Sequence, residues 1–159
     1  LTEFLKTNET ECNFYLHYAM QGYSENFKVD NKHVKIIDPT STDIRDLILC
    51  SDLFITDRSS LAFDFAYMLK PVIYVDFDSK ELELYHYKPG YFEYIRDGFG
   101  PVHRDPNCVV SYILELAENN GKMEATYISR AKNFFPIQDK NNSERTYNAI
   151  INFLKDCGT

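Results

Sequence analysis

The chain has 159 residues, of which 44% are hydrophobic, 15% aromatic and 26% charged, and its net charge is −7. This length is that of about one ordinary domain, and the apolar and aromatic content is too high for a disordered segment. The acidic balance argues against a broad nucleic-acid or anionic-membrane surface, because such surfaces depend on clustered Lys and Arg.

The first residues, "LTEFLKTNETEC", read as the middle of a helix, and the chain begins with Leu rather than Met. We therefore expect a fragment of a longer polypeptide. No apolar run approaches the roughly 18 residues that span a bilayer, so no transmembrane segment is predicted. Four scattered cysteines without a C-x-x-C pair indicate neither a zinc site nor a disulfide framework, and they fit a reduced cytoplasmic setting.

Short apolar runs then alternate with amphipathic stretches, which is typical of strand–helix–strand units that build a parallel sheet. We expect strands over residues 12–18, 33–37, 52–56 and 71–77. Right-handed crossovers would connect these strands. The sequence thus predicts an α/β fold, in which a parallel sheet is flanked by helices.

Two crossover helices are expected between these strands. The first follows Ser41 or Thr42, either of which can cap it, and carries an apolar stripe at helical spacing. The second begins near Ser59, and Pro71 stops it before the next strand. The stripe residues are Ile44, Leu47 and Ile48 in the first helix and Leu61, Phe65 and Met68 in the second.

The pattern loosens over residues 79–105, which we interpret as a long, partly ordered loop of the kind that is usually functional or lid-like. Its aromatic cluster from Tyr85 to Tyr94 can stack on a cytosine, cover a binding cleft or pack the loop on the sheet. Three helices are expected over residues 106–120, 122–135 and 142–156. The last helix places Tyr147, Ile150, Ile151 and Leu154 at helical spacing, which predicts a core stripe.

Five consecutive polar residues follow the third expected strand: Thr56, Asp57, Arg58, Ser59 and Ser60. Ligands bind beyond the carboxyl ends of parallel strands, and a helix start offers unpaired N–H groups to phosphate or pyrophosphate. The serine hydroxyls can add hydrogen bonds and Arg58 a positive charge. The alternative is that Ser59 is only an N-cap and Asp57 a turn residue. The sequence contains no P-loop, G-x-G-x-x-G or H-E-x-x-H pattern.

Residues 43–78 resemble the C-terminal domain of CDP-glycerol glycerophosphotransferases, the teichoic-acid primases and polymerases. In that family S-D-x-x-I-T-D-Y-S-S-x-x-F-D-x-A precedes a K-R-P-type turn and a strand. The matching residues are Ser51, Asp52, Thr56, Asp57, Ser59, Ser60, Phe63, Asp64, Ala66 and Pro71, followed by Gly90, Phe92, Gly100 and Pro101 in a second motif. The similarity runs from about residue 14 to about residue 115.

The resemblance implies one nucleotide-binding Rossmann-like domain over residues 1–159, as the C-terminal fragment of a two-domain enzyme of GT-B arrangement. This domain would bind the CDP part of the donor, with Ser59 and Ser60 at the pyrophosphate and Thr56, Asp57 and Arg58 beside them. Asp64 lies one turn deeper on the expected helix and would support the serines. Its alternative role is to satisfy a nearby backbone amide.

The resemblance also implies a catalytic role for His17. The family carries R-x-H-P after the first strand, whereas this chain has Tyr15, His17 and Tyr18 in "YLHYA". Arg58 stands where the family usually has Tyr, and it would replace the positive charge of the missing arginine. The alternative for His17 is a hydrogen-bonded structural histidine.

The implied activity is transfer of glycerol phosphate, or another polyol phosphate, from a CDP-linked donor to a hydroxyl of a cell-surface polymer such as teichoic acid or capsule. CDP-glycerol is the substrate, and no cofactor or metal site is predicted. The contacts to the glycopolymer or lipid-linked acceptor and the catalytic base would belong to the missing domain. The fragment alone should therefore bind CDP and be catalytically inactive. We expect a cytoplasmic location, with contact to the inner membrane surface arising only in the full-length protein.

Two alternatives remain open. A UDP-type glycosyltransferase of GT-B fold would use the same strand end for a nucleotide sugar. A degenerate, non-catalytic interaction domain is favoured by the loss of the Arg and Pro around His17.

Overall fold

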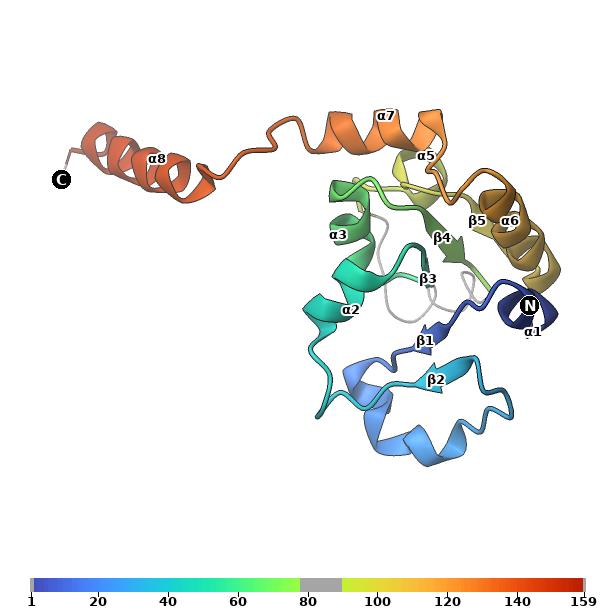
Figure 1. The fold of residues 1–159 in the computed structure, drawn as a ribbon. Coiled ribbons are helices and arrows are strands. Elements are labelled where there is room, and N and C mark those ends of the chain that lie inside the picture. Colours follow the sequence, from blue (N-terminus) through green and yellow to red (C-terminus); the bar gives the residue numbers. More distant parts are fainter. Residues whose placement is uncertain (1, 78–89, 159) are drawn as a thin grey trace.

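The computed structural model describes residues 2–77 and 90–158 (Figure 1). Its strands are β1 (Cys12–Phe14), β2 (Val34–Ile36), β3 (Phe54–Thr56), β4 (Val72–Val75) and β5 (Val102–His103). All pairings among them are parallel, which confirms the predicted α/β fold. The described strands form two sheets, β1-β2 and β3-β4-β5, rather than the single sheet that the alternation predicted.

The larger sheet is built around β4, whose residues face two helical layers. Val72 and Tyr74 pack with α3 (Leu61–Tyr67) and α7 (Ala125–Phe134) on one face. Ile73 packs with α6 (Pro106–Glu118) on the other face. Figure 1 shows α3 and α6 on opposite sides of β4. Because both faces of β4 are covered, its sequence is a continuous apolar run without alternation.

The first predicted strand ends early. β1 has three residues, and His17 caps the 3-10 helix η1 (Tyr18–Asn26), which pattern reading missed. The helix α1 (Thr2–Thr7) precedes β1, and its aromatic Phe4 packs at the edge of the α6 cluster.

The helix α2 (Ile44–Cys50) is capped by Asp43, whose carboxylate accepts a hydrogen bond from the Arg45 N–H. The prediction of Ser41 or Thr42 as the cap was therefore wrong by one or two residues. Carboxylates are N-caps as good as serine, so composition alone does not decide between neighbouring candidates. In α6 the N-cap is Asp105, whose carboxylate accepts a hydrogen bond from the Asn107 N–H.

The predicted loop over residues 79–105 contains two regular elements, α5 (Tyr94–Asp97) and β5. Phe99 between them is fully buried, and Phe92 and Tyr94 pack against the same core cluster. This packing supports the interpretation that the aromatic residues hold the segment on the sheet. Tyr91 of the predicted cluster is exposed, and Tyr85 and Tyr87 lie outside the described residues.

The predicted core stripe of the last helix was wrong. In α8 (Asn142–Asp156) the exposed fractions of Tyr147, Ile150 and Leu154 are 64%, 53% and 45%. Figure 1 shows this helix extending away from the sheet. An amphipathic pattern marks a face that can be buried, but it does not identify the surface that buries it.

Candidate functional site

The predicted phosphate-binding segment forms a tight turn between β3 and α3. The buried Thr56 hydroxyl accepts a hydrogen bond from the Ser59 N–H at 3.1 Å. The Ser59 hydroxyl in turn accepts from the Leu61 N–H at 3.3 Å, and the Asp57 carboxylate accepts from the Arg58 N–H at 2.6 Å. The segment is thus shaped by its own side chains, and the Ser59 hydroxyl bonds to the first residue of α3 although Ser60 occupies the N-cap position.

The two serines differ in how their hydroxyls are used. Ser60 is the N-cap residue of α3, but its side chain makes no capping hydrogen bond. Ser60 is exposed, whereas Ser59 is half-buried. A hydroxyl that accepts a bond can still donate its proton, so both serines retain a donor. Ser60 is the more accessible of the two.

Arg58 turns from this segment toward the end of the neighbouring strand. Its Nη2 atom lies 3.6 Å from the Oδ1 atom of Asp76, the residue that follows β4. The other carboxylate oxygen of Asp76 accepts a hydrogen bond from the Nε atom of Arg104 at 3.2 Å. Two guanidinium groups therefore share one carboxylate at the carboxyl edge of the sheet.

The sequence pointed to only one of the three residues in these two contacts. Arg58 was a candidate because it stands in the polar run, while Asp76 and Arg104 were missed. The available signal was a charged residue directly after an apolar strand, which Asp76 satisfies. Arg104 follows β5, and a two-residue strand leaves no pattern to read.

The tyrosine beneath this edge is structural. Burial raises the pKa of Tyr74 to about 12, and its hydroxyl accepts a hydrogen bond from the Phe99 N–H at 3.4 Å. A phenol with so high a pKa stays neutral near pH 7. Tyr74 therefore connects β4 to the segment before β5 without adding charge to the site.

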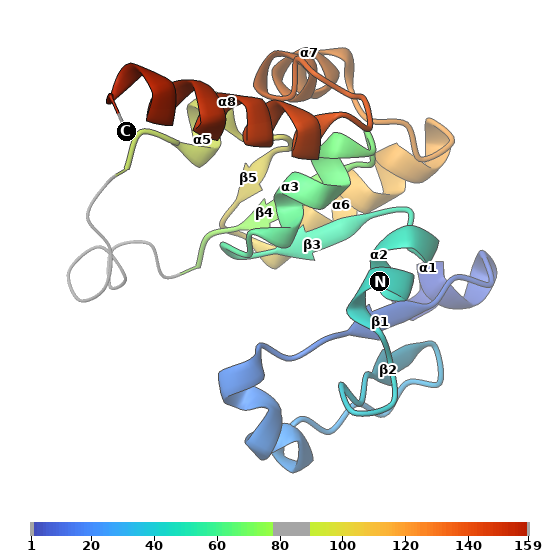
Figure 2. The same cartoon turned by 90° about the vertical axis from the view of Figure 1, so that its left-hand side faces the viewer.

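The contacts of His17 are with its neighbours in the chain. Its Nδ1 atom accepts a hydrogen bond from the Ala19 N–H at 3.3 Å, and its ring lies 4.2 Å from that of Tyr18, centroid to centroid. Within residues 2–77 and 90–158, no hydrogen bond or ion pair joins His17 to the 56–60 segment. Figure 2 shows η1 on the same side of the molecule as the carboxyl ends of β3 and β4.

Asp64 is exposed on α3. The hydrogen bond predicted from its carboxylate to the serines or to a backbone amide is not found among the contacts of the described residues. Thr56, Asp57, Arg58, Ser59 and Ser60 thus form one turn, and no side-chain hydrogen bond or ion pair among the described residues joins His17 or the Asp64 carboxylate to it.

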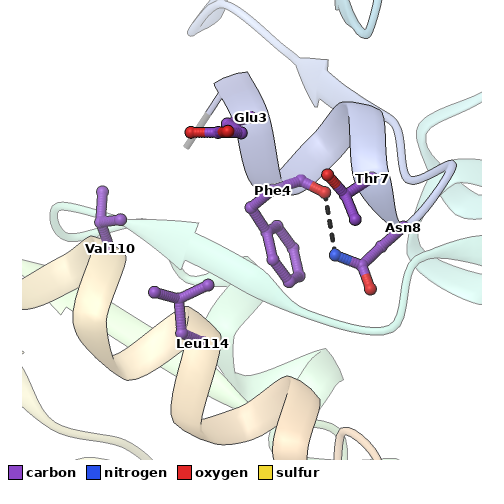
Figure 3. A pocket seen from close by; sticks show the side chains of 6 residues that line it. All are labelled: Glu3, Phe4, Thr7, Asn8, Val110 and Leu114. Atoms are coloured by element: carbon purple, nitrogen blue, oxygen red, sulfur yellow. Dashed lines mark hydrogen bonds between the residues drawn. The ribbon is translucent and has the colours of Figure 1, made fainter.

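A cavity of about 440 Å³ lies elsewhere, between α1 and α6 (Figure 3). Its lining residues are Glu3, Phe4, Thr7, Asn8, Val110 and Leu114. The Asn8 side chain donates a hydrogen bond to the Phe4 carbonyl at 2.9 Å, which holds it against α1. None of these residues stands at a strand end, and the cavity is separate from the candidate site.

Residues 2–77 and 90–158 contain neither a metal-binding cluster nor a membrane-spanning helix. No group of three or more His, Cys, Asp or Glu side chains there is arranged to hold a metal ion. Over the same ranges, no helix combines the length and apolar character needed to cross a bilayer.

Comparison with known families identifies the same family as the motif that contains the polar run at the end of β3. Residues 1–152 match a family model described as CDP-Glycerol:Poly(glycerophosphate) glycerophosphotransferase. No solved structure matches the chain.

Several curated proteins are similar to the chain. The minor teichoic acid biosynthesis protein GgaB of Bacillus subtilis is 39% identical over 151 residues, which are 95% of this chain and 16% of that protein. A teichoic acid glycerol-phosphate transferase of Staphylococcus aureus is 30% identical over 69% of the chain and 28% of its own length. A teichoic acid poly(glycerol phosphate) polymerase of Bacillus subtilis is 28% identical over 69% of the chain and 14% of its own length. The chain therefore spans only a minor part of each of these relatives.

Proposed function

The chain belongs to the CDP-glycerol:poly(glycerophosphate) glycerophosphotransferase family, and from this we propose that it binds the CDP-linked donor of a polyol-phosphate transferase. The donor is CDP-glycerol or a related CDP-polyol. The acceptor is a hydroxyl of a cell-surface polymer such as teichoic acid, and its contacts belong to parts of the parent protein outside this chain. The reaction takes place on the cytoplasmic side.

One observation supports this assignment above the others. At the carboxyl end of β3, Arg58 directly precedes Ser59 and Ser60, which both have a hydroxyl proton to donate, and its guanidinium lies 3.6 Å from Asp76 at the end of the neighbouring strand. Guanidinium groups and hydroxyls are favourable donors to phosphate oxygens, and charge-assisted hydrogen bonds are the stronger kind. In a chain with a net charge of −7, such a local group is needed to hold a diphosphate.

The proposed reaction is an in-line displacement at the phosphorus that carries the polyol. The acceptor oxygen forms the new bond to this phosphorus, the bond to the bridging oxygen breaks, and CMP leaves with the electron pair. Arg58 and the serines stabilise the charge that develops on the leaving phosphate. The base that takes the acceptor proton lies outside this chain, so the chain alone binds the donor without transferring the polyol phosphate.

His17 enters this proposal as a donor to phosphate. Because its Nδ1 atom accepts from Ala19, the neutral ring carries its proton on Nε2. This nitrogen can donate to a phosphate oxygen of the CDP-linked substrate.

The test is a calorimetric titration of the chain with CDP, CMP and UDP, repeated on the variant Ser60→Ala. Ser60 makes no capping hydrogen bond, so this substitution removes a donor without disturbing α3. We expect CDP to bind best and Ser60→Ala to weaken it by about tenfold, the loss of one hydrogen bond to a charged group. Ser111→Ala, on the exposed surface of α6, is the matched control and should leave the affinity unchanged.

Two outcomes would contradict the assignment. Preference for UDP would indicate a nucleotide-sugar glycosyltransferase. Absence of nucleotide binding by a chain with intact circular dichroism would indicate a non-catalytic interaction domain.

A further inference from the structure

We propose that Arg104 is a second phosphate-binding residue of the donor site and that Asp76 positions it there beside Arg58. This inference rests on the proposed function, because it assigns a further residue to the same diphosphate. Arg58, Asp76 and Arg104 are separated in sequence by 18 and 28 residues, and each follows a different strand of the sheet. Their proximity is a product of the sheet alone.

The register of the sheet explains why the three residues meet. Thr56 pairs with Tyr74 across β3 and β4, so two residues further on Arg58 stands opposite Asp76. Val75 pairs with His103 across β4 and β5, so one residue further on Asp76 stands opposite Arg104. The three side chains form one row across the carboxyl edge, which is where parallel sheets bind ligands.

The row is anchored by the backbone as well as by side chains. The Asp76 N–H donates to the His103 carbonyl at 2.9 Å, which fixes the residue before Arg104 against the end of β4. The Asp76 side chain is only 16% exposed, whereas that of Arg104 is 67% exposed. The carboxylate is therefore held inside the edge, and the guanidinium of Arg104 reaches outward from it.

The hydrogen-bond donors of the row exceed its acceptors. Arg104 uses its Nε–H on Asp76, and its four terminal N–H groups have no hydrogen-bond partner among the described residues. Two guanidinium groups and one carboxylate leave a net charge of about +1 on the row at neutral pH. A purely structural bridge would be complete with one arginine. The second, outward-facing arginine suits a ligand with two phosphate groups, one for each guanidinium.

The experiment compares the affinities for CDP and CMP in the unsubstituted chain and in Arg104→Gln. Glutamine retains a polar side chain but removes the charge. We expect CDP to bind about tenfold more weakly to Arg104→Gln while CMP changes by less than about threefold, so that the ratio of the two affinities falls. Arg45→Gln is the matched control. The Arg45 side chain is 82% exposed and pairs with Asp43 at the start of α2, away from the strand ends. Both affinities should stay unchanged in this variant.

The positioning role of Asp76 is tested by a double-mutant cycle. In an Asp76→Ala background, Arg104→Gln should weaken CDP binding by only about threefold, because the arginine is no longer held in place. A fully additive cycle would overturn the positioning role.

The outcomes separate this inference from the proposed function. If Ser60→Ala weakens CDP binding and Arg104→Gln does not, the assignment of Arg104 is overturned and the donor site stands. An equal loss of CDP and CMP affinity in Arg104→Gln would identify a structural arginine and would overturn it as well. If the unsubstituted chain binds no CDP, the proposed function fails, and the inference fails with it.

Discussion

Gly100 packs directly against the carbonyl group of Val72, so that a Cβ atom on Gly100 would lie 1.7 Å from that oxygen. Val72 is fixed in the central strand, where it pairs with Phe54, and it is 1% exposed. Neither backbone can retreat, because the Pro101 carbonyl that follows accepts a hydrogen bond from the Tyr74 N–H. The close approach explains why this position, shared with the family motif, requires glycine.

We therefore expect Gly100→Ala to lower the free energy of unfolding by about 3 kcal/mol or more. Urea denaturation followed by circular dichroism measures the change. Gly22→Ala is the matched control: nothing lies within 4 Å of the Cβ position at Gly22, and the substitution should change stability by less than about 1 kcal/mol. Equal effects of the two substitutions would contradict the packing argument.

Lys70, which precedes the family's proline, has a structural role in this chain. Its ammonium group donates to the Ile48, Leu49 and Ser51 carbonyls at 3.0, 2.7 and 2.8 Å. These carbonyls lie at the end of α2, where backbone acceptors lack partners within the helix and a cation is favoured. Lys70 thus joins the end of α3 to the end of α2.

Replacement of Lys70 by Met should cost about 1.5–3 kcal/mol of stability, since it removes hydrogen bonds to a charged group while keeping the length of the side chain. Thermal unfolding of the two proteins provides the comparison. Lys132→Met, at an exposed position on α7, should have little effect. A Lys70→Met protein as stable as the Lys132→Met protein would show that the three bonds contribute nothing.

The strands that could be located best from the sequence are those whose own residues show how the strand is buried. β4 is buried on both faces, so its apolar run and the proline before it were sufficient. β5 has only two residues and is held by Gly100 and by pairing to β4, and neither feature is visible without the partner strand. Short elements that depend on contacts with distant segments cannot be found from hydrophobic periodicity.

The same distinction applies to the candidate site. The polar run from Thr56 to Ser60 is contiguous, so its position after a strand was enough to single it out. The row that adds Asp76 and Arg104 exists only when the registers of two strand pairs are known. A register is a relation between segments, and no single segment contains it.

Asp97 gives the stability of the chain a pH dependence with a definite sign. Hydrogen bonds from the Arg96 side chain and from the Glu93 N–H lower the pKa of Asp97 to about 2 from its ordinary 3.8. A carboxyl with a lowered pKa in the folded state stabilises the protein above the unfolded pKa, and this contribution is lost as pH falls. We expect the loss between about pH 4 and pH 2.

Unfolding by urea at a series of pH values tests this expectation. Asp97→Asn should make stability less dependent on pH in that window, because the substituted residue does not titrate. Asp30→Asn is the control, since Asp30 is exposed and has no hydrogen bond or ion pair among the described residues. An unchanged acid limb in Asp97→Asn would mean that other groups account for the dependence.

The exposed stripe of α8 leads to a prediction opposite to the one that its sequence pattern favoured. A core stripe would make Tyr147 and Ile150 intolerant of polar replacement, whereas their exposed fractions of 64% and 53% mean that little apolar area is lost. The double variant Tyr147→Ser/Ile150→Ser should change the stability of the chain by less than about 1 kcal/mol. Differential scanning calorimetry would show an unchanged main transition.

The same substitution in a buried helix supplies the contrast. Ile113 in α6 is 7% exposed and packs with Ile73 beneath the central strand, so Ile113→Ser should cost about 3 kcal/mol or more. If the α8 variant were as destabilised as Ile113→Ser, the stripe of α8 would have to be buried against the chain itself in solution. The pair of measurements therefore decides whether the amphipathic face of α8 contributes to the fold of this chain.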